Sequence, residues 1–269
     1  MKPRTLSFNL KAGIFLALII GGISLTGLFY QPYDYNLMDS EKRFSPPSFS
    51  HLMGTDNFGR DVFSRLMAGA RYTLLIAFFT VAGSAIIGTI LGLSSGYMGG
   101  FWDEIIMRLM DALSSFPGIL LALVMIALFG NSPGTLVMAL MILFIPGFTR
   151  IMRNGILQYK TRDFILAARI TGVPHSRIIF VHILPNLYSP LLSASVIGFS
   201  NAILAESTMS YLGLGIQPPE ASLGRMLSES QMFLFTAPWY AISTGMAIVL
   251  LILGFGLLGE GYDQGNGNA

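Results

Sequence analysis

Long runs that contain no Asp, Glu, Lys or Arg dominate this chain. Because a helix rises about 1.5 Å per residue and the bilayer core is about 30 Å thick, about 20 apolar residues make one membrane span. The run over 112–149 is too long for one span, and the Gly-Asn-Ser-Pro-Gly sequence at 130–134 breaks it as a turn signal. The pattern predicts six transmembrane helices, at about 12–30, 73–97, 113–130, 135–152, 187–206 and 239–258.

The apolar runs favour helices over a membrane β-barrel. Strands of such a barrel alternate apolar and polar residues, whereas these runs are apolar throughout. The composition agrees, since 53% of the residues are hydrophobic and 11% are charged, against about 25% charged residues in a soluble domain. The sequence therefore predicts an all-α membrane protein. It contains no cysteine, which excludes disulfides and thiolate metal sites.

Basic residues predict the orientation of the helices in the membrane. Lys2, Arg4 and Lys11 precede the first span, and residues 150–186 contain six Lys or Arg against one acid, Asp163. Lys and Arg gather in cytoplasmic loops, so both segments are expected in the cytoplasm, with both termini inside. The 31–71 and 207–238 loops are then external, although 31–71 also carries five basic residues.

The 150–186 loop is predicted to fold outside the membrane as a helix, a glycine and a second helix. Asp163 is expected to cap the first helix, which contains the small residues Ala167 and Ala168. Gly172 suits the end of this helix, and Pro174 suits the first turn of the next one. A basic loop held inside by its charge is the simpler alternative.

This loop resembles the EAA loop of binding-protein-dependent ABC importer permeases. In that pattern Glu-Ala-Ala is followed by a Gly four residues later and then by Ile-x-Leu-Pro or a variant. Leu166 stands where the pattern has Glu, which puts the contact made by that carboxylate in doubt. The positions that match are Ala167, Ala168, Gly172, Ile183, Leu184 and Pro185.

Two other stretches resemble the peptide/nickel group of these permeases. Residues 52–71 are similar to the segment before the second helix of that group, and residues 206–219 to the segment after the fifth. The resemblance covers nearly the whole chain and is closest to the C-type permease of dipeptide and oligopeptide importers.

The resemblance implies a type I ABC importer permease fold with a cytoplasmic coupling helix. It implies a heterodimer with a second permease, two ATPase subunits that bind ATP and Mg, an extracytoplasmic substrate-binding protein, and a prokaryotic plasma (inner) membrane. The residues implied in coupling to the ATPase are Ala167, Ala168, Arg169, Gly172, Ile183, Leu184 and Pro185.

Other positions suggest packing and pairing within the membrane. Gly88, Gly92 and Gly96 recur every four residues, which lines one helix face with small side chains for close packing. Arg108 and Asp111 are three residues apart and are expected to pair near the start of the third span. Glu206 ends the fifth span, where pairing or an interfacial role is expected over contact with substrate.

We assign no catalytic, cofactor-binding or metal-binding residue, and predict that the chain is not an enzyme. Residues 54–61 approach the phosphate-loop pattern but lack its Lys and Ser/Thr, so a turn before the second helix is the better interpretation. His51, His175 and His182 have no cysteine and no clustered carboxylates beside them. The net charge of +2 does not argue for nucleic acid.

The function predicted is import of di- or oligopeptides, with nickel or a metal chelate as the alternative cargo. A secondary transporter would need inverted repeats and charged midplane residues, and neither is evident. A non-transporting assembly subunit would not need a folded loop at 150–186. We divide the chain into residues 1–71, a helix with its external loop, and 72–269, a core of five spans.

Overall fold

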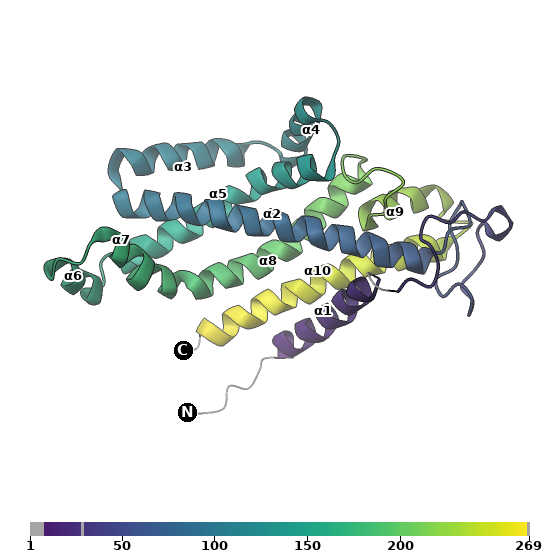
Figure 1. Cartoon of the computed structure of the whole chain (residues 1–269), viewed down its shortest axis with the longest axis horizontal. Coiled ribbons are helices and arrows are strands. Elements are labelled where there is room, and N and C mark those ends of the chain that lie inside the picture. Colours follow the sequence, from purple (N-terminus) through teal and green to yellow (C-terminus); the bar gives the residue numbers. More distant parts are fainter. Residues whose placement is uncertain (1–7, 28–29, 268–269) are drawn as a thin grey trace.

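The computed structural model describes residues 8–27 and 30–267, and its architecture is helical (Figure 1). In chain order the helices are α1 Phe8–Thr26, η1 Ser40–Lys42, α2 Val62–Met98, α3 Gly100–Ser115, α4 Gly118–Phe129, α5 Pro133–Tyr159, α6 Asp163–Ile170, α7 His175–Arg177, the π-helical η2 Ile178–Ile183, α8 Leu184–Tyr211, α9 Leu223–Ser230, η3 Gln231–Phe233 and α10 Pro238–Gly267.

The long helices form a bundle whose two ends differ (Figure 1). Helices α6 and α7 project at one end, which we call the α6 end. Residues 30–61 lie together with residues 212–237 at the opposite end, and we call these two segments the loop cap. Helix α10 runs from the loop cap back towards the α6 end, with α1 packed along it. The predicted cytoplasmic and external loops are thus at opposite ends, while their orientation in a membrane stays a prediction.

Four continuous stretches of the described chain are long and apolar enough to cross a membrane, namely 62–98, 133–159, 175–211 and 238–262. A fifth is obtained if α3 and α4 together make one broken span. In α1 the apolar helix found is shorter, Leu10–Ile19. The predicted count of six spans therefore stays a prediction.

The third span differs from the straight helix predicted at 113–130. Helix α3 already begins at Gly100, and α4 is bent away from it by 93°. Pro117 explains the break, because the residue before a proline is pushed out of the helical region, and Phe116 is extended with φ −80° and ψ 131°. The predicted turn at 130–134 is present, since Gly130 has φ +79° and the Ser132 hydroxyl accepts a hydrogen bond from the Thr135 N–H at 3.1 Å.

Helices α2 and α5 approach each other at three glycines. A Cβ atom on Gly88 would lie 2.5 Å from the Cβ of Phe148, and one on Gly92 would lie 2.5 Å from the carbonyl oxygen of Thr149. A Cβ atom on Gly96 would lie 3.0 Å from the carbonyl oxygen of Arg153. These positions therefore hold the two backbones in close contact, and the helix that packs on them belongs to the same chain.

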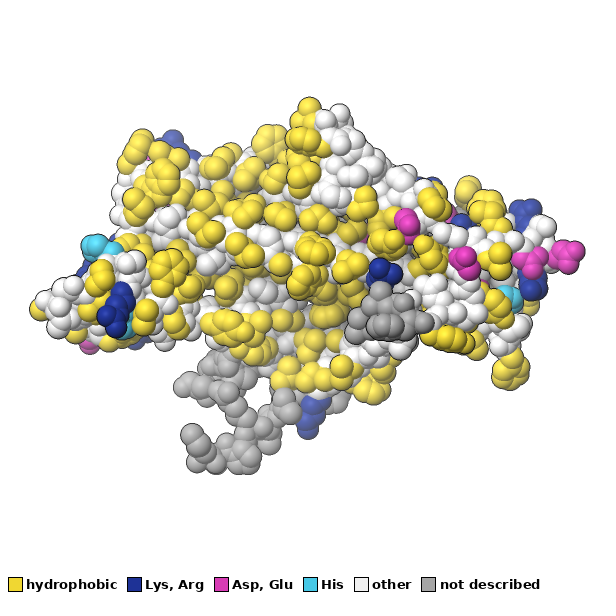
Figure 2. Space-filling model, in the orientation of Figure 1, with side chains coloured by type: hydrophobic (Ala, Val, Ile, Leu, Met, Phe, Trp, Pro, Cys, Tyr) yellow, Lys and Arg dark blue, Asp and Glu magenta, His cyan; other side chains and the backbone are white. Residues whose placement is uncertain are grey.

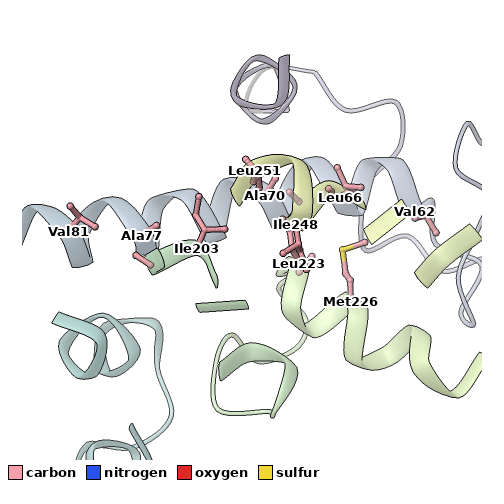
Figure 3. Close-up of a cluster of buried hydrophobic side chains, with 14 of the residues drawn as sticks. Val62, Leu66, Ala70, Ala77, Val81, Ile203, Leu223, Met226, Ile248 and Leu251 are labelled. Carbon is pink, nitrogen blue, oxygen red and sulfur yellow. The ribbon is translucent and has the colours of Figure 1, made fainter. Parts of the chain in front are cut away.

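A core of buried apolar side chains joins α2 to α8, α9 and α10 (Figure 3). Val62, Leu66 and Ala70 recur every four residues on α2, so they share one face of the helix. Ile203 on α8, Met226 on α9 and other side chains of α9 and α10 contact that face. The loop-cap half of the bundle is thereby held together through α2.

The segment at 54–61 is the turn that begins α2, as interpreted from the sequence. The carboxylate of Asp61 caps the helix by accepting hydrogen bonds from the N–H and the hydroxyl of Ser64, both at 2.8 Å. The Nδ1 atom of His51 lies 2.9 Å from the other oxygen of Asp61. Helix α2 consequently starts at Val62, earlier than the predicted residue 73, and residues 71 and 72 lie within it.

Charged side chains buried in the loop cap tie α2 to α9 and α10. Arg65 is 1% exposed, and its Nη1 donates to Asp56 at 2.6 Å, to Glu229 at 3.1 Å and to the Tyr240 hydroxyl at 3.1 Å. Arg60 also donates to Asp56, at 2.7 Å. Burial alone would raise the pKa of the Glu229 carboxyl, but the charges of Arg65 and Arg60 outweigh it and hold that pKa below its usual value.

Candidate functional site

Helix α6 is a short helix of the predicted 150–186 loop, and its end is defined by Gly172. Asp163 is its first residue, with Arg162 at the N-cap, so Asp163 adds charge to the first turn and does not cap it as predicted. Gly172 has φ +79°, which suits glycine, and its N–H bonds the Arg169 carbonyl at 3.0 Å. The Val173 N–H bonds the Ala168 carbonyl at 3.0 Å, completing a Schellman motif.

One face of α6 is anchored in a buried apolar cluster. Ile165 is fully buried, and the cluster around it includes Ile156 on α5 and Leu187 on α8. Ile178 and Ile183, from the two ends of η2, are also fully buried there. These side chains come from both long helices that flank the loop, so α6 shares one apolar cluster with α5 and α8.

The last turn of α2 contacts the same loop through Tyr97. The guanidinium of Arg169 and the ammonium of Lys160 each lie 5.7 Å from the centre of the Tyr97 ring, a cation–π arrangement. Lys160 also donates to the carbonyl oxygen of Tyr97 at 2.7 Å. The Tyr97 hydroxyl is hydrogen-bonded to Nδ1 of His175. Tyr97 therefore links α2 to both sides of α6.

The remaining predicted coupling residues lie in or just after α6, at the end of η2 and at the start of α8. Ala167 and Gly172 are exposed, and Ala168 is half-buried beside the apolar cluster. Ile183 ends η2, where the helix changes from π to α geometry, and Leu184 and Pro185 begin α8. Ile183 thus faces the core, while Pro185 is exposed at the start of α8.

Sequence reasoning missed Tyr97, Lys160 and His175 as members of this site. Their contacts join segments that are distant in the chain, and no local spacing reveals them. The one available signal was the position of Tyr97, at the predicted end of the second span and close to the cytoplasmic side where the 150–186 loop was expected.

Charged residues on α3 and α5 pair differently from the prediction. Arg108 pairs with Glu104 on its own helix, and Asp111 pairs with Arg150 on α5 at 2.8 Å, so the expected pair of Arg108 with Asp111 is wrong. Asp103 receives two hydrogen bonds from Arg153, each at 2.6 Å. Two ion pairs therefore connect α3 with α5 near the α6 end.

Glu206 is fully buried on α8, and no ion pair for it is found in the described part of the chain. The Ser210 hydroxyl donates to its Oε1 at 2.6 Å, and hydroxyl groups of Thr73 and Ser207 are also close.

Within residues 8–27 and 30–267, no group of three or more His, Asp or Glu side chains is arranged to hold a metal ion.

The long helices are apolar, and a folded segment with basic residues projects at one end of the bundle. Residues 88–265 match the family described as binding-protein-dependent transport system inner membrane component. This chain belongs to that family and is a multi-pass membrane protein of the ABC importer permease type. The predicted family and fold class are thereby confirmed.

Relatives extend the match to nearly the whole chain. The dipeptide transport system permease protein DppC of Alkalihalophilus pseudofirmus is 41% identical over 84% of this chain and 75% of its own length. DppC of Haemophilus influenzae is 35% identical over 93% of this chain and 86% of its own length. The glutathione transport system permease protein GsiD of Pectobacterium atrosepticum is 39% identical over 93% of this chain and 83% of its own length.

A solved structure of the MetNI methionine ABC transporter, in an inward-facing conformation, has a similar fold. The TM-score is 0.59 at 18% sequence identity, and the match covers 75% of this chain and 94% of that one. This likeness supports the permease fold alone.

Proposed function

We propose that this chain is the permease subunit of an ATP-driven importer of di- or oligopeptides, and that α6 is its coupling helix. The observation that carries the proposal is the anchoring of α6. This helix projects from the bundle, yet Ile165 and Tyr97 connect it to α2, α5 and α8 (Figure 1). A helix that is exposed to a partner and fixed to three long helices suits the transmission of movement.

In this mechanism the chain performs no chemistry of its own. ATP and Mg bind to two partner ATPase subunits, and closure of those subunits displaces α6. The displacement passes through the Ile165 cluster to α5 and α8 and through Tyr97 to α2, and the pathway shared with a second permease changes from inward-open to outward-open. A binding protein outside the membrane delivers the cargo to the loop-cap side.

Peptide cargo is favoured over nickel or a metal chelate by the relatives. DppC proteins are named for dipeptide transport, and GsiD is named for transport of glutathione, itself a small peptide. All three relatives cover at least four fifths of this chain. The cargoes named for these relatives all contain a peptide bond.

The test is affinity purification of the chain from its native membrane in mild detergent, followed by identification of the proteins that accompany it. We expect two ATPase subunits and a second permease of similar hydropathy. The associated binding protein is then titrated with dipeptides and with nickel, and we expect it to bind the peptides. A chain that purifies without an ATPase would contradict the proposal.

A further inference from the structure

A groove between α5 and α8 is lined by uncharged residues. Its volume is about 430 Å³, within the range of about 300–1,000 Å³ that is usual for sites of small ligands. We call it the α5–α8 groove, and its lining includes Phe144, Gly147, Ile151, Ala194, Ile197 and Asn201. None of the described residues that line it is charged or a histidine, so the groove suits an uncharged part of a cargo and offers no charged ligand to a metal ion.

Asn201 lies near the middle of the bundle. Its neighbour Ser200 donates a hydrogen bond at 2.8 Å to the carbonyl oxygen of Ile252, at the middle of α10. Gly198, about one helical turn away, faces α5, since a Cβ atom there would lie 3.3 Å from Cζ of Phe148. On the face drawn in Figure 2, the surface between the two ends of the bundle is mostly hydrophobic. Asn201 is therefore a polar residue at a depth where apolar side chains prevail.

The side-chain amide of Asn201 is exposed, and no hydrogen bond of it is found in the described part of the chain. Thr208 is also exposed on α8, but its hydroxyl donates to the carbonyl oxygen of Leu204 at 2.8 Å. An amide that faces lipid without a partner is unfavourable, because hydrocarbon offers no hydrogen bond. Polar side chains at such depths usually face a water-filled cavity or a partner. Asn201 is therefore expected to meet a polar occupant of the groove.

The carboxamide of Asn201 matches the chemistry of a peptide bond. Its carbonyl oxygen can accept a hydrogen bond from a peptide N–H, and its NH₂ group can donate to a peptide C=O. Neither contact needs a charge, which agrees with the uncharged lining of the groove. Peptides of different sequence share these backbone groups, so one amide can contact all of them.

Small residues leave room in the groove for the side chains of a cargo. A Cβ atom on Gly147 would meet nothing within 4 Å, so the space in front of this part of α5 is open. Ala194 and Gly198 keep the α8 wall low. The groove therefore combines one unpaired amide with open space beside it.

We propose that Asn201 contacts the cargo, and that its side-chain carbonyl accepts a hydrogen bond from the peptide N–H as the cargo passes along the α5–α8 groove. The side chains of the cargo occupy the open space beside Gly147. The proposal rests on the function proposed above, and it adds the residue and the chemical group through which the chain recognises a peptide. Lipid and a helix of the second permease are the other possible occupants of the groove, and the test distinguishes them.

The experiment compares uptake of a dipeptide with uptake of its ester analogue, in which oxygen replaces the peptide N–H. The complex that purifies with this chain is placed in proteoliposomes and supplied with ATP and the cargo-loaded binding protein. Selection by the binding protein affects each variant equally, so it cancels when the peptide-to-ester ratio of initial rates is compared between variants. We expect Asn201→Leu and Asn201→Ala to lower this ratio about tenfold, because the peptide N–H loses its acceptor and the ester has none to lose.

Thr208→Val is the matched control, because it removes a polar group from an exposed position of the same helix outside the groove. The Thr208 hydroxyl is already bonded within α8, so we expect the peptide-to-ester ratio of this variant to stay within about twofold of wild type.

Gly147→Leu tests the path of the cargo through a change of size. Leucine is a good helix former and its Cβ meets no neighbour here, so α5 should stay intact while the groove narrows. We expect uptake of a dipeptide with two aromatic side chains to fall about tenfold, and uptake of glycylglycine to stay within about twofold. Gly21→Leu on α1 is the control, because nothing lies within 4 Å of its Cβ position either, and it should affect both cargoes equally.

The outcomes separate this inference from the function on which it rests. A peptide-to-ester ratio equal to that of wild type in both Asn201 variants overturns the contact with cargo, whether or not total uptake falls, and leaves the proposed function in place. Loss of the second permease from both variant complexes assigns the amide to contact between permeases and also overturns it. Equal losses for both cargoes in Gly147→Leu overturn the path along the groove. Failure of the wild-type complex to take up any dipeptide contradicts the proposed function itself.

Discussion

Gly172 has a backbone conformation that other residues adopt only with strain. Its φ of +79° completes the cap of α6, and nothing lies within 4 Å of the place a Cβ would occupy. Glycine is therefore needed at this position for its backbone conformation, and not because a side chain would clash with a neighbour. Asparagine visits this region more readily than other non-glycine residues, whereas β-branched residues do so rarely.

We predict that Gly172→Val weakens attachment of the ATPase, while Gly172→Asn largely preserves it. A non-glycine residue in this region costs about 1–2 kcal/mol, which would shift or unwind the end of α6. Co-purification of the ATPase measures the effect, with recovery of the permease from the membrane as the control for insertion. Equal attachment of the ATPase to Gly172→Val and wild type would argue against α6 as the docking helix.

Glu229 makes the loop cap sensitive to acid. Its pKa is held below the usual value, so the pairing with Arg65 contributes stability that is present above pH 4.5 and is lost as the pH falls through the lowered value. We predict that protection of the backbone amides in residues 54–66 and 223–230, measured as exchange relative to the intrinsic rate at each pH, falls below about pH 4.5, the ordinary glutamate range. Glu229→Gln should exchange faster already at pH 7 and respond less to acid. Identical pH profiles for Glu229→Gln and wild type would contradict this role.

The roles and contacts of some residues could be predicted from the sequence, and those of others could not. Gly172 was predictable because a glycine after a short helical pattern is a local signal. The ion pair proposed for Arg108 and Asp111 used only spacing along one helix, and Arg150 on α5 is closer to Asp111 in the fold. The contact of Tyr97 with Arg169 joins distant segments, which one sequence cannot bring together.

Among the elements, the contact between α2 and α5 depends on the absence of side chains. We predict that Gly92→Val destabilises the chain by about 1–3 kcal/mol or more, the usual cost of over-packing, because a Cβ there would lie 2.5 Å from the carbonyl oxygen of Thr149. Gly22→Ala on α1 is the control, since nothing lies within 4 Å of its Cβ position. Thermal unfolding in detergent measures both. A midpoint for Gly92→Val equal to that of Gly22→Ala would contradict the close packing.

Several helices begin or bend at residues that the apolar runs alone did not predict. Charge-free runs placed the start of the second span at residue 73, but Arg65 lies inside α2 because buried partners compensate its charge. The bend between α3 and α4 follows from Pro117, which lies inside an apolar run and was therefore counted as part of one straight span. Helix α9 was not predicted, since its eight residues are too short for a hydrophobic run.

At the scale of the whole molecule, the absence of cysteine makes the topology directly measurable. Ser50→Cys adds one thiol to the loop cap, and Thr161→Cys adds one beside α6, both at exposed positions. We predict that a membrane-impermeant maleimide labels the Ser50→Cys variant in intact cells, and the Thr161→Cys variant only after permeabilisation. The reverse pattern would contradict the orientation with both termini inside.

We propose that this chain couples ATP-driven movement of its partners to peptide import. The most direct measurement is uptake of a labelled dipeptide into proteoliposomes containing the purified complex, with the binding protein and ATP supplied on their respective sides. We predict uptake that requires both ATP and the binding protein and is lost in Gly172→Val. Uptake by this chain alone, driven by an ion gradient without ATP, would contradict the claim.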